Sequence, residues 1–298
     1  MTKVKILTDS CSDLTGTLMD RYGIDYCQMK TVYNEVQSPA NLRWSDTEVH
    51  DFYEILRSGE RITTTQVPVE EYKTVFTKYL ELGYDIVYIG CALKQSGSVN
   101  TAGVVAKNLL EKYPKHKIFC IDSLNATIGE GMLAIEAAKL CADGSRSADE
   151  IKEWVLAHRK NVLEYATVHS LDALKRAGRV KASSAFFGNL MGVKPILIAD
   201  ADGNQAAFKK VKGRQTSFKE IVNLLKVNIV NAEKQTVYIA HADCSEEELN
   251  QLTSLVKEEI KPAAIETVYI GPIIGASVGP DTIGVWGFGN EVTWKAGE

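Results

Sequence analysis

Short apolar runs alternate with longer amphipathic stretches through the first half of the chain. The strand-like runs cover residues 3–7, 84–91 and 117–121. The helices predicted by apolar spacing cover residues 14–22, 99–113, 126–142 and 148–158. Pro68, with Glu70 and Glu71 behind it, suits the first turn of a further helix. Strands that alternate with helices favour a parallel α/β sheet.

In the second half of the chain the predicted strands and helices no longer alternate regularly. Its predicted strands cover residues 165–169, 193–199, 205–211, 236–240, 265–270 and 282–288. Helices are predicted over 170–178, over 216–231 and from Ser245, where Glu248 has the spacing of a capping box. Asp202-Gly203 between two strands is a hairpin signal, and a hairpin within an α/β pattern favours a mixed sheet. We therefore predict an α/β protein of two domains, residues 1–161 and 162–298.

Composition narrows the possible partners. The 298 residues are 45% hydrophobic and 24% charged, which is usual for a soluble protein. The net charge of −4 and the scattered Lys and Arg residues argue against nucleic acid or an anionic membrane surface as the main partner. We expect no membrane span and no signal peptide, and hence a cytoplasmic protein. The six cysteines lack metal-binding spacing and are expected to be reduced and mostly buried.

Hydroxyl side chains gather in the loops that follow the predicted strands. They are Thr8, Ser10, Ser12, Thr63, Thr64, Thr65, Ser96, Ser98 and Ser123. Ligands of open α/β sheets bind beyond the carboxyl ends of the strands. Hydroxyls at helix N-termini, together with free backbone N–H groups, form a neutral site for a carboxylate or phosphate. Each residue is equally suited to a structural role as a helix cap.

Several familiar catalytic motifs are absent from the sequence. It contains no P-loop. The dinucleotide-like Gly129-x-Gly131 falls inside a predicted helix instead of at a strand-to-helix turn. Asp9, Asp13 and Asp122 offer either a Mg²⁺ site or, for the first two, caps for the first helix. We expect no metal and no cofactor.

Two segments combine glycine with apolar residues. Residues 271–284 place Gly at near-regular spacing between two strands, which predicts a tightly constrained loop. Residues 185–193 mix large apolar side chains with Gly and suit either a narrow apolar tunnel or ordinary core packing. The basic cluster Lys209, Lys210, Lys212 and Arg214 suits a solvated hairpin or a small anion patch.

Motifs along the whole chain resemble those of the DegV family of bacterial fatty-acid-binding proteins. The opening Thr8-Asp9-Ser10 with Asp13-Leu14, the Thr63–Gln66 run, and Ser96-Gly97-Ser98 are similar to its TDS-x-x-DL, TTSQ and SGT motifs. Further similar elements are Asp122-Ser123, Gly178-Arg179-Val180, Lys194-Pro195-Ile196-Leu197, Asp202-Gly203 and the glycines of 271–280.

The resemblance implies two α/β domains with one long-chain fatty acid between them. It places the carboxylate on Thr64 and Ser96, with Thr65 nearby, and the acyl tail in an apolar tunnel. It also implies that the protein presents the acid to a fatty acid kinase, which forms acyl phosphate. We expect Ser277 and Arg179 to lie near the head group.

This chain departs from the family pattern at three places. Ser277 stands where kinase-linked members commonly have His, Lys212 where Arg is common, and Val67 where the TSQ segment continues with Pro. These departures bear on the kinase partnership more than on lipid binding. The alternative function is an enzyme that acts on a carboxylate or phosphate ligand in the same cleft. Ser96 or Ser123 would be its nucleophile and His241 its base.

Overall fold

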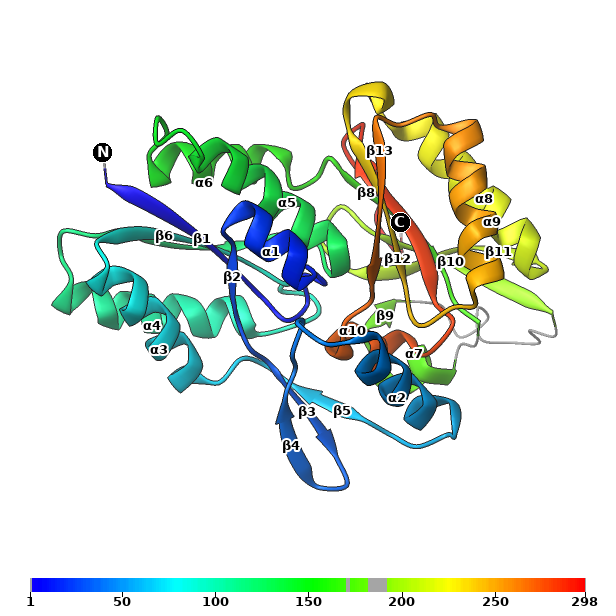
Figure 1. Ribbon diagram of the computed structural model, residues 1–298, viewed down its shortest axis with the longest axis horizontal. Coiled ribbons are helices and arrows are strands. Elements are labelled where there is room, and N and C mark those ends of the chain that lie inside the picture. The colour runs from blue at the N-terminus through cyan, green and yellow to red at the C-terminus, as the bar shows by residue number, and fades with distance from the viewer. Residues whose placement is uncertain (1, 170–171, 182–191, 298) are drawn as a thin grey trace.

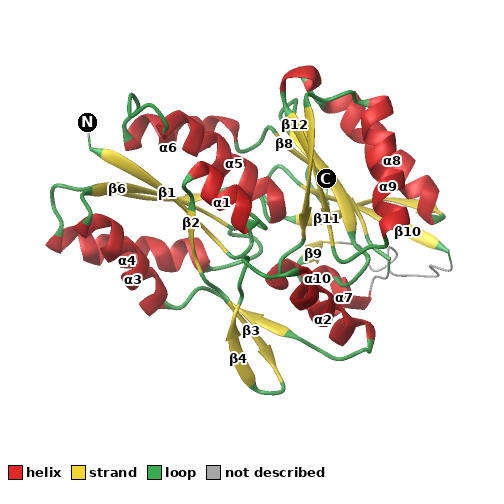
Figure 2. Cartoon of the chain, viewed as in Figure 1, coloured by secondary structure: helices red, strands yellow, loops and turns green. Residues whose placement is uncertain are grey.

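The first sheet of the computed structural model is wholly parallel, as the sequence predicts. The structure describes residues 2–169, 172–181 and 192–297. The strands are β1 (Lys3–Asp9), β2 (Asp25–Cys27), β6 (Tyr84–Gly90) and β7 (Ile118–Asp122), in the order β2-β1-β6-β7. Its helices are α1 (Gly16–Tyr22), α3 (Val69–Glu81), α4 (Ser98–Lys112), α5 (Thr127–Cys141) and α6 (Ala148–His158). Helices α3 and α4 cover one face and α5 and α6 the other (Figure 2). Both faces are thus buried, as parallel sheets require.

The second sheet is mixed and has seven strands in the order β13-β12-β14-β8-β10-β11-β9. Its strands are β8 (Val162–Thr167), β9 (Val180–Lys181), β10 (Val193–Ala199), β11 (Gln205–Lys212), β12 (Thr236–His241), β13 (Ala264–Tyr269) and β14 (Ile283–Phe288). The accompanying helices are α7 (Asp172–Ala177), α8 (Arg214–Asn228), the short 3-10 helix η2 (Ala232–Lys234), α9 (Glu246–Glu259) and α10 (Pro272–Val278). Strands β10 and β11 form the predicted hairpin at Asp202-Gly203. The predicted fold class is therefore confirmed.

A small antiparallel sheet between the two halves has no counterpart in the prediction. It contains β3 (Lys30–Tyr33), β4 (Val36–Pro39) and β5 (Thr63–Thr65), and the helix α2 (Asp46–Arg57) precedes β5. In Figure 1 this sheet extends below the two halves, and β5 leads back towards α3. The threonine run that was expected to be a loop is thus an edge strand, with Thr64 paired to Thr31.

Helix α5 is buried between the two large sheets. It contacts β1 on one side and β8, β12 and β14 on the other. Gly129 and Gly131 lie within it, as predicted, and they allow this close packing. A Cβ at Gly131 would lie 2.6 Å from the Ser12 carbonyl oxygen, and one at Gly129 would lie 3.2 Å from Val162 Cγ1. The first strand of the second sheet begins at Val162, and the domain division at 161/162 stays a prediction.

Three local predictions are wrong. Residues 271–284 are not only a loop, because Pro272 starts the short helix α10, where a proline at the first position loses no hydrogen bond. Glu248 does not close a capping box on Ser245, because its carboxylate accepts hydrogen bonds from Arg214 at 2.9 and 2.8 Å. These contacts also make Arg214 an ion-pair partner of Glu248. Only 14% of its side chain is exposed, so it is not a solvated hairpin residue.

The structure also bears on the cysteines and on the expected absence of a membrane span. All six thiols are free, and Cys11, Cys27 and Cys91 are buried. In the described part of the chain, no helix has the length and apolar character needed to cross a membrane. The apolar segment predicted to line a tunnel falls largely outside the described residues, at 185–191.

Candidate functional site

A cavity of about 280 Å³ is lined by both halves of the chain. Cys11 and Cys91 border it from the loops after β1 and β6, which is the edge where α/β sheets bind ligands. Ala166 and Leu197 contribute from the seven-stranded sheet, and Ile274 contributes from α10. The volume is close to the lower end of the range for ligand pockets, about 300 Å³.

One face of the second sheet carries a row of small side chains, of which Ala166 lines the cavity. Ala240, Gly284, Ala166 and Leu197 are consecutive partners across β12, β14, β8 and β10. Three of these four positions are Ala or Gly. Because a Cβ at Gly284 would lie 2.7 Å from Trp286 Cη2, the glycine also lets the indole lie across the sheet. The indole of Trp286 occupies the space over Gly284 and lines the cavity beside Ala166.

The hydroxyls of the cavity mouth come from β5 and from the start of α4. Thr64, Thr65 and Ser96 all line the cavity, as predicted. Gly97 brings the two segments together, since a Cβ there would lie 2.8 Å from Gln66 Oε1. The Ser96 hydroxyl donates to Ser98 Oγ at 2.9 Å and accepts from Ser98 N at 3.3 Å, so its proton must leave Ser98 Oγ before it can be donated to a ligand.

Ser277 and Arg179 lie at the same mouth. Both line the cavity and also an adjoining outer pocket, which they share with Thr64. Arg61 and Arg176 line that outer pocket as well. Three arginines therefore line the outer pocket, and the guanidinium of Arg179 also donates to the Ala177 carbonyl. Sequence reasoning missed Arg61 and Arg176, although the (i, i+3) spacing of Arg176 and Arg179 was a usable signal.

Three other hydroxyls of the predicted anion site, those of Thr8, Ser10 and Ser123, have structural roles. Thr8 donates to Glu130 Oε1 at 2.5 Å, Ser10 to the Ala40 carbonyl at 2.8 Å, and Ser123 to the Asn125 carbonyl at 2.9 Å. All three residues are buried. The structure thus brings together the Thr64 and Ser96 segments, and it leaves the strand-end serines of β1 and β7 in the core.

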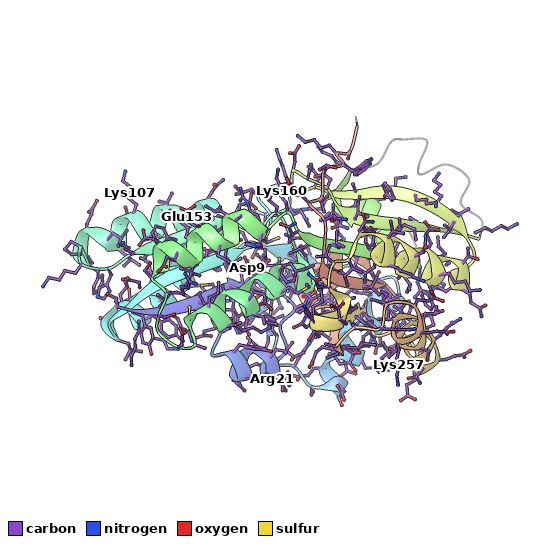
Figure 3. The ribbon with its side chains drawn as sticks, turned by 90° about the horizontal axis from the view of Figure 1, so that it is seen from above. Asp9, Arg21, Lys107, Glu153, Lys160 and Lys257 are labelled. Carbon is purple, nitrogen blue, oxygen red and sulfur yellow. The ribbon has the colours of Figure 1, made fainter. Side chains whose placement is uncertain are left out.

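The carboxyl groups at the end of β1 bind backbone and tyrosine groups. Asp9 accepts from Tyr88 Oη at 2.7 Å and from Cys11 N at 2.9 Å, and Asp13 accepts from Gly271 N at 2.8 Å. Figure 3 shows Asp9 in the middle of the molecule. Burial raises the pKa of both carboxyls. Neither caps α1, which Thr15 caps instead, so the capping prediction is wrong.

A metal at these carboxyls finds no support in the described residues. No group of three or more His, Cys, Asp or Glu side chains among them is arranged to hold an ion. Asp122 is turned towards the backbone, where its Oδ1 accepts from Leu93 N and Leu124 N.

The inner wall of the cavity carries a buried polar group that the sequence did not reveal. Glu164 accepts from Gln205 Nε2 at 2.6 Å and from Trp286 Nε1 at 3.3 Å. All three residues line the cavity, together with Thr127. Burial raises the pKa of Glu164 to about 7, and the two hydrogen bonds oppose this rise.

The histidine required by the enzyme alternative lies elsewhere. His241 borders a different groove with Asp13 and Cys244, and its Nδ1 accepts from Cys244 N at 3.3 Å. Burial lowers the pKa of His241 to about 4. The hydroxyls of Ser96 and Ser123 donate to Ser98 and Asn125 instead of to an imidazole. The described geometry therefore supplies no serine–histidine pair.

The fold defines an α/β protein with two large sheets and one small one. The site is a mainly apolar cavity whose mouth carries hydroxyl side chains and Arg179. The family model described as "Uncharacterised protein, DegV family" matches residues 3–288. A DegV domain-containing protein of Clostridium perfringens is 34% identical over 290 residues, which cover 97% of this chain and 99% of that protein. The chain belongs to the DegV family.

Solved structures share the fold over nearly the whole chain. A DegV lipid binding protein from Thermotoga maritima has a TM-score of 0.84 and 25% identity, with 98% of this chain and 100% of that chain covered. DegV of Bacillus subtilis, described as a fatty acid binding protein, has a TM-score of 0.83 and 24% identity, with 97% and 100% covered. The predicted resemblance is confirmed at the level of the family.

Proposed function

We propose that this protein binds a long-chain fatty acid, with the carboxylate at the mouth and the acyl tail inside the cavity. The observation that carries the proposal is a cavity that combines hydroxyls at its mouth with Ala, Leu and Ile side chains along much of its wall. The lipid and fatty acid binding described for the Thermotoga maritima and Bacillus subtilis proteins supports it.

The tail provides most of the binding free energy in this proposal. Burial of apolar surface contributes about 0.8 kcal/mol for each CH₂ group. Leu174, Ile270, Ile273 and Ile274 offer that surface. The interior has no need of specific polar contacts to hold the tail.

The head group is held by neutral donors with cations behind them. The hydroxyls of Thr64 and Ser96 donate to the carboxylate, with Thr65 and Ser277 beside them. Arg179 balances the charge from the rim. A carboxylate held by hydroxyls gains about 1.5–3 kcal/mol per hydrogen bond. Ser96 first exchanges its hydrogen bond to Ser98 for one to the ligand.

Presentation of the bound acid to a fatty acid kinase is the finer part of the proposal. Arg61, Arg176 and Arg179 line the outer pocket beside the opening, where a partner that handles the carboxylate must approach. Ser277 at the same opening cannot titrate near neutral pH as a histidine would. Transfer of phosphate from ATP by an added kinase to acid delivered on this protein tests this step. Equal rates with and without the protein contradict it.

Ligand binding is tested on the protein as purified and after removal of its lipid. Mass spectrometry under native conditions, followed by lipid extraction, is expected to find a co-purifying long-chain acid. A metal or nucleotide in its place contradicts the proposal and favours the enzyme alternative.

Substitution of the mouth hydroxyls tests the assigned roles. Ser96→Ala and Thr64→Ala are each expected to weaken fatty acid binding by about tenfold or more, since one hydrogen bond to a charged group is lost. Thr101→Ala is the matched control, because Thr101 lies in α4 and does not line the cavity, and its hydroxyl donates to the Gly97 carbonyl. Unchanged affinity in both mouth variants, measured by fluorescent fatty acid displacement, contradicts the assignment.

A further inference from the structure

The inner wall of the cavity contains a polar cluster that a plain acyl chain cannot use. Glu164 is 4% exposed, and both of its hydrogen-bond partners, Gln205 and Trp286, are neutral. A carboxyl group buried next to apolar surface is costly unless its remaining hydrogen-bonding capacity is satisfied. A saturated hydrocarbon tail offers nothing to satisfy it.

Thr127 supplies a second, independent sign of a polar ligand. It is 6% exposed, lines the same cavity, and its hydroxyl has no hydrogen-bond partner among the described residues. Its backbone has a φ of 52° at the start of α5, which is unusual for a β-branched residue. The chain thus holds a hydroxyl in the cavity wall at a conformational cost.

The cluster lies deep in the cavity, away from the mouth. Thr282 and Trp286 both line the cavity and are four residues apart on one extended segment, about 13 Å. Thr282 donates to the Val278 carbonyl at 3.1 Å and so lies beside the Ser277 end. Glu164 is the cross-strand partner of Trp286 at the other end. This distance is shorter than an extended long-chain acid, so the cluster faces the middle of a bound tail.

We propose that Glu164, Gln205 and Thr127 form a subsite for a hydroxyl group in the middle of the acyl chain, which makes hydroxylated fatty acids the preferred ligands. A hydroxyl both donates and accepts. It can donate to the Glu164 carboxyl and accept from the Thr127 hydroxyl, which satisfies both groups. The inference rests on the proposed function, since it assumes that an acyl chain occupies this cavity.

A matched pair of ligands tests the subsite. Stearic acid and a stearic acid with one mid-chain hydroxyl are compared by displacement of a fluorescent fatty acid from delipidated protein. The wild-type protein is expected to bind the hydroxylated acid about tenfold more tightly, the effect of one additional buried hydrogen bond. Thr127→Val, which keeps the branched shape and removes the hydroxyl, is expected to abolish most of this preference.

Two further variants separate ligand recognition from structural support. Thr167→Val removes another buried hydroxyl without a described partner, but Thr167 does not line the cavity, so the preference is expected to remain. Glu164→Gln keeps the side-chain size and is expected to reduce the preference, and it provides the test if Thr127→Val does not fold.

The outcomes are distinct from those that test fatty acid binding itself. Tight binding of stearic acid with equal or weaker binding of the hydroxylated acid overturns the subsite and leaves the proposed function standing. A preference that Thr127→Val and Glu164→Gln both leave unchanged also overturns the subsite and makes the cluster a cross-strand support. Failure to bind either acid contradicts the proposed function.

Discussion

The two faces of the seven-stranded sheet have different roles: one packs against helices, and the other borders the cavity. On one face Tyr165, Ile196, Ile198 and Val285 pack against α8 and α9 in a closed apolar cluster. On the other face the intervening positions include the small Ala166, the polar Glu164 and its cross-strand partner Trp286. That face borders the cavity.

Because side chains alternate along a strand, neighbouring residues can have separate roles, one in stability and the other in lining the cavity. Successive side chains of a strand point to opposite faces, so neighbours such as Tyr165 and Ala166 belong to different environments. The packed face supplies folding free energy by burial. The open face gives up part of that free energy and keeps room for a ligand.

The largest expected effect is on the packed face. Phe218 of α8 is fully buried there. Phe218→Ala is expected to lower the free energy of unfolding by about 3–5 kcal/mol, through lost burial and the cavity left behind. Urea denaturation measures it, and a loss of less than about 1 kcal/mol would show that this face is not the tightly packed one.

The next effect concerns pH and the open face. The pKa of Glu164 is about 7 when folded and 4.5 in its ordinary state, so the folded protein holds more protons between these values. The free energy of unfolding is therefore expected to fall as pH rises from 4.5 to 7. The change is about 1.4 kcal/mol per pH unit, or about 3 kcal/mol in all. Glu164→Gln removes this contribution, while the raised carboxyls of Asp9, Asp13 and Glu130 act in both proteins. Parallel stability curves of the two proteins would contradict the assignment.

The substitution with the smallest expected effect on stability, Ala166→Leu, distinguishes the two faces of the sheet most clearly. Ala166→Leu adds bulk towards the cavity and is expected to change the free energy of unfolding by less than about 1 kcal/mol while fatty acid binding is lost. Ala206→Leu is the matched control, since Ala206 is fully buried and pairs with Ile198 of the packed face. It is expected to cost about 1–3 kcal/mol and to leave binding intact. Equal costs for both variants would remove the distinction between the faces.

Much of the fold followed from local patterns. The parallel strands, the β10–β11 hairpin and the buried helix α5 all correspond to runs of apolar spacing, which depend only on neighbouring residues. The predicted mouth residues Thr64, Thr65, Ser96, Ser277 and Arg179 do line one cavity. Their role in holding a carboxylate stays a prediction.

Other features escaped the sequence because they depend on distant partners. The short strands β3 to β5 have little periodicity of their own and are held by pairing with one another. Glu248 has capping-box spacing, yet Arg214, 34 residues away, takes its carboxylate. Glu164 reads as an ordinary polar residue until Trp286 and Gln205 are placed beside it.

The sequence by itself determined the two α/β halves, the hairpin and the family, because these reside in local periodicity and in motif order. Only the tertiary structure decided where the cavity lies and what its inner wall contains. The physical reason is that a cavity is lined by residues that lie far apart in the chain. Ala166, Leu197 and Trp286 come from three strands, and they border one cavity only when the sheet aligns those strands.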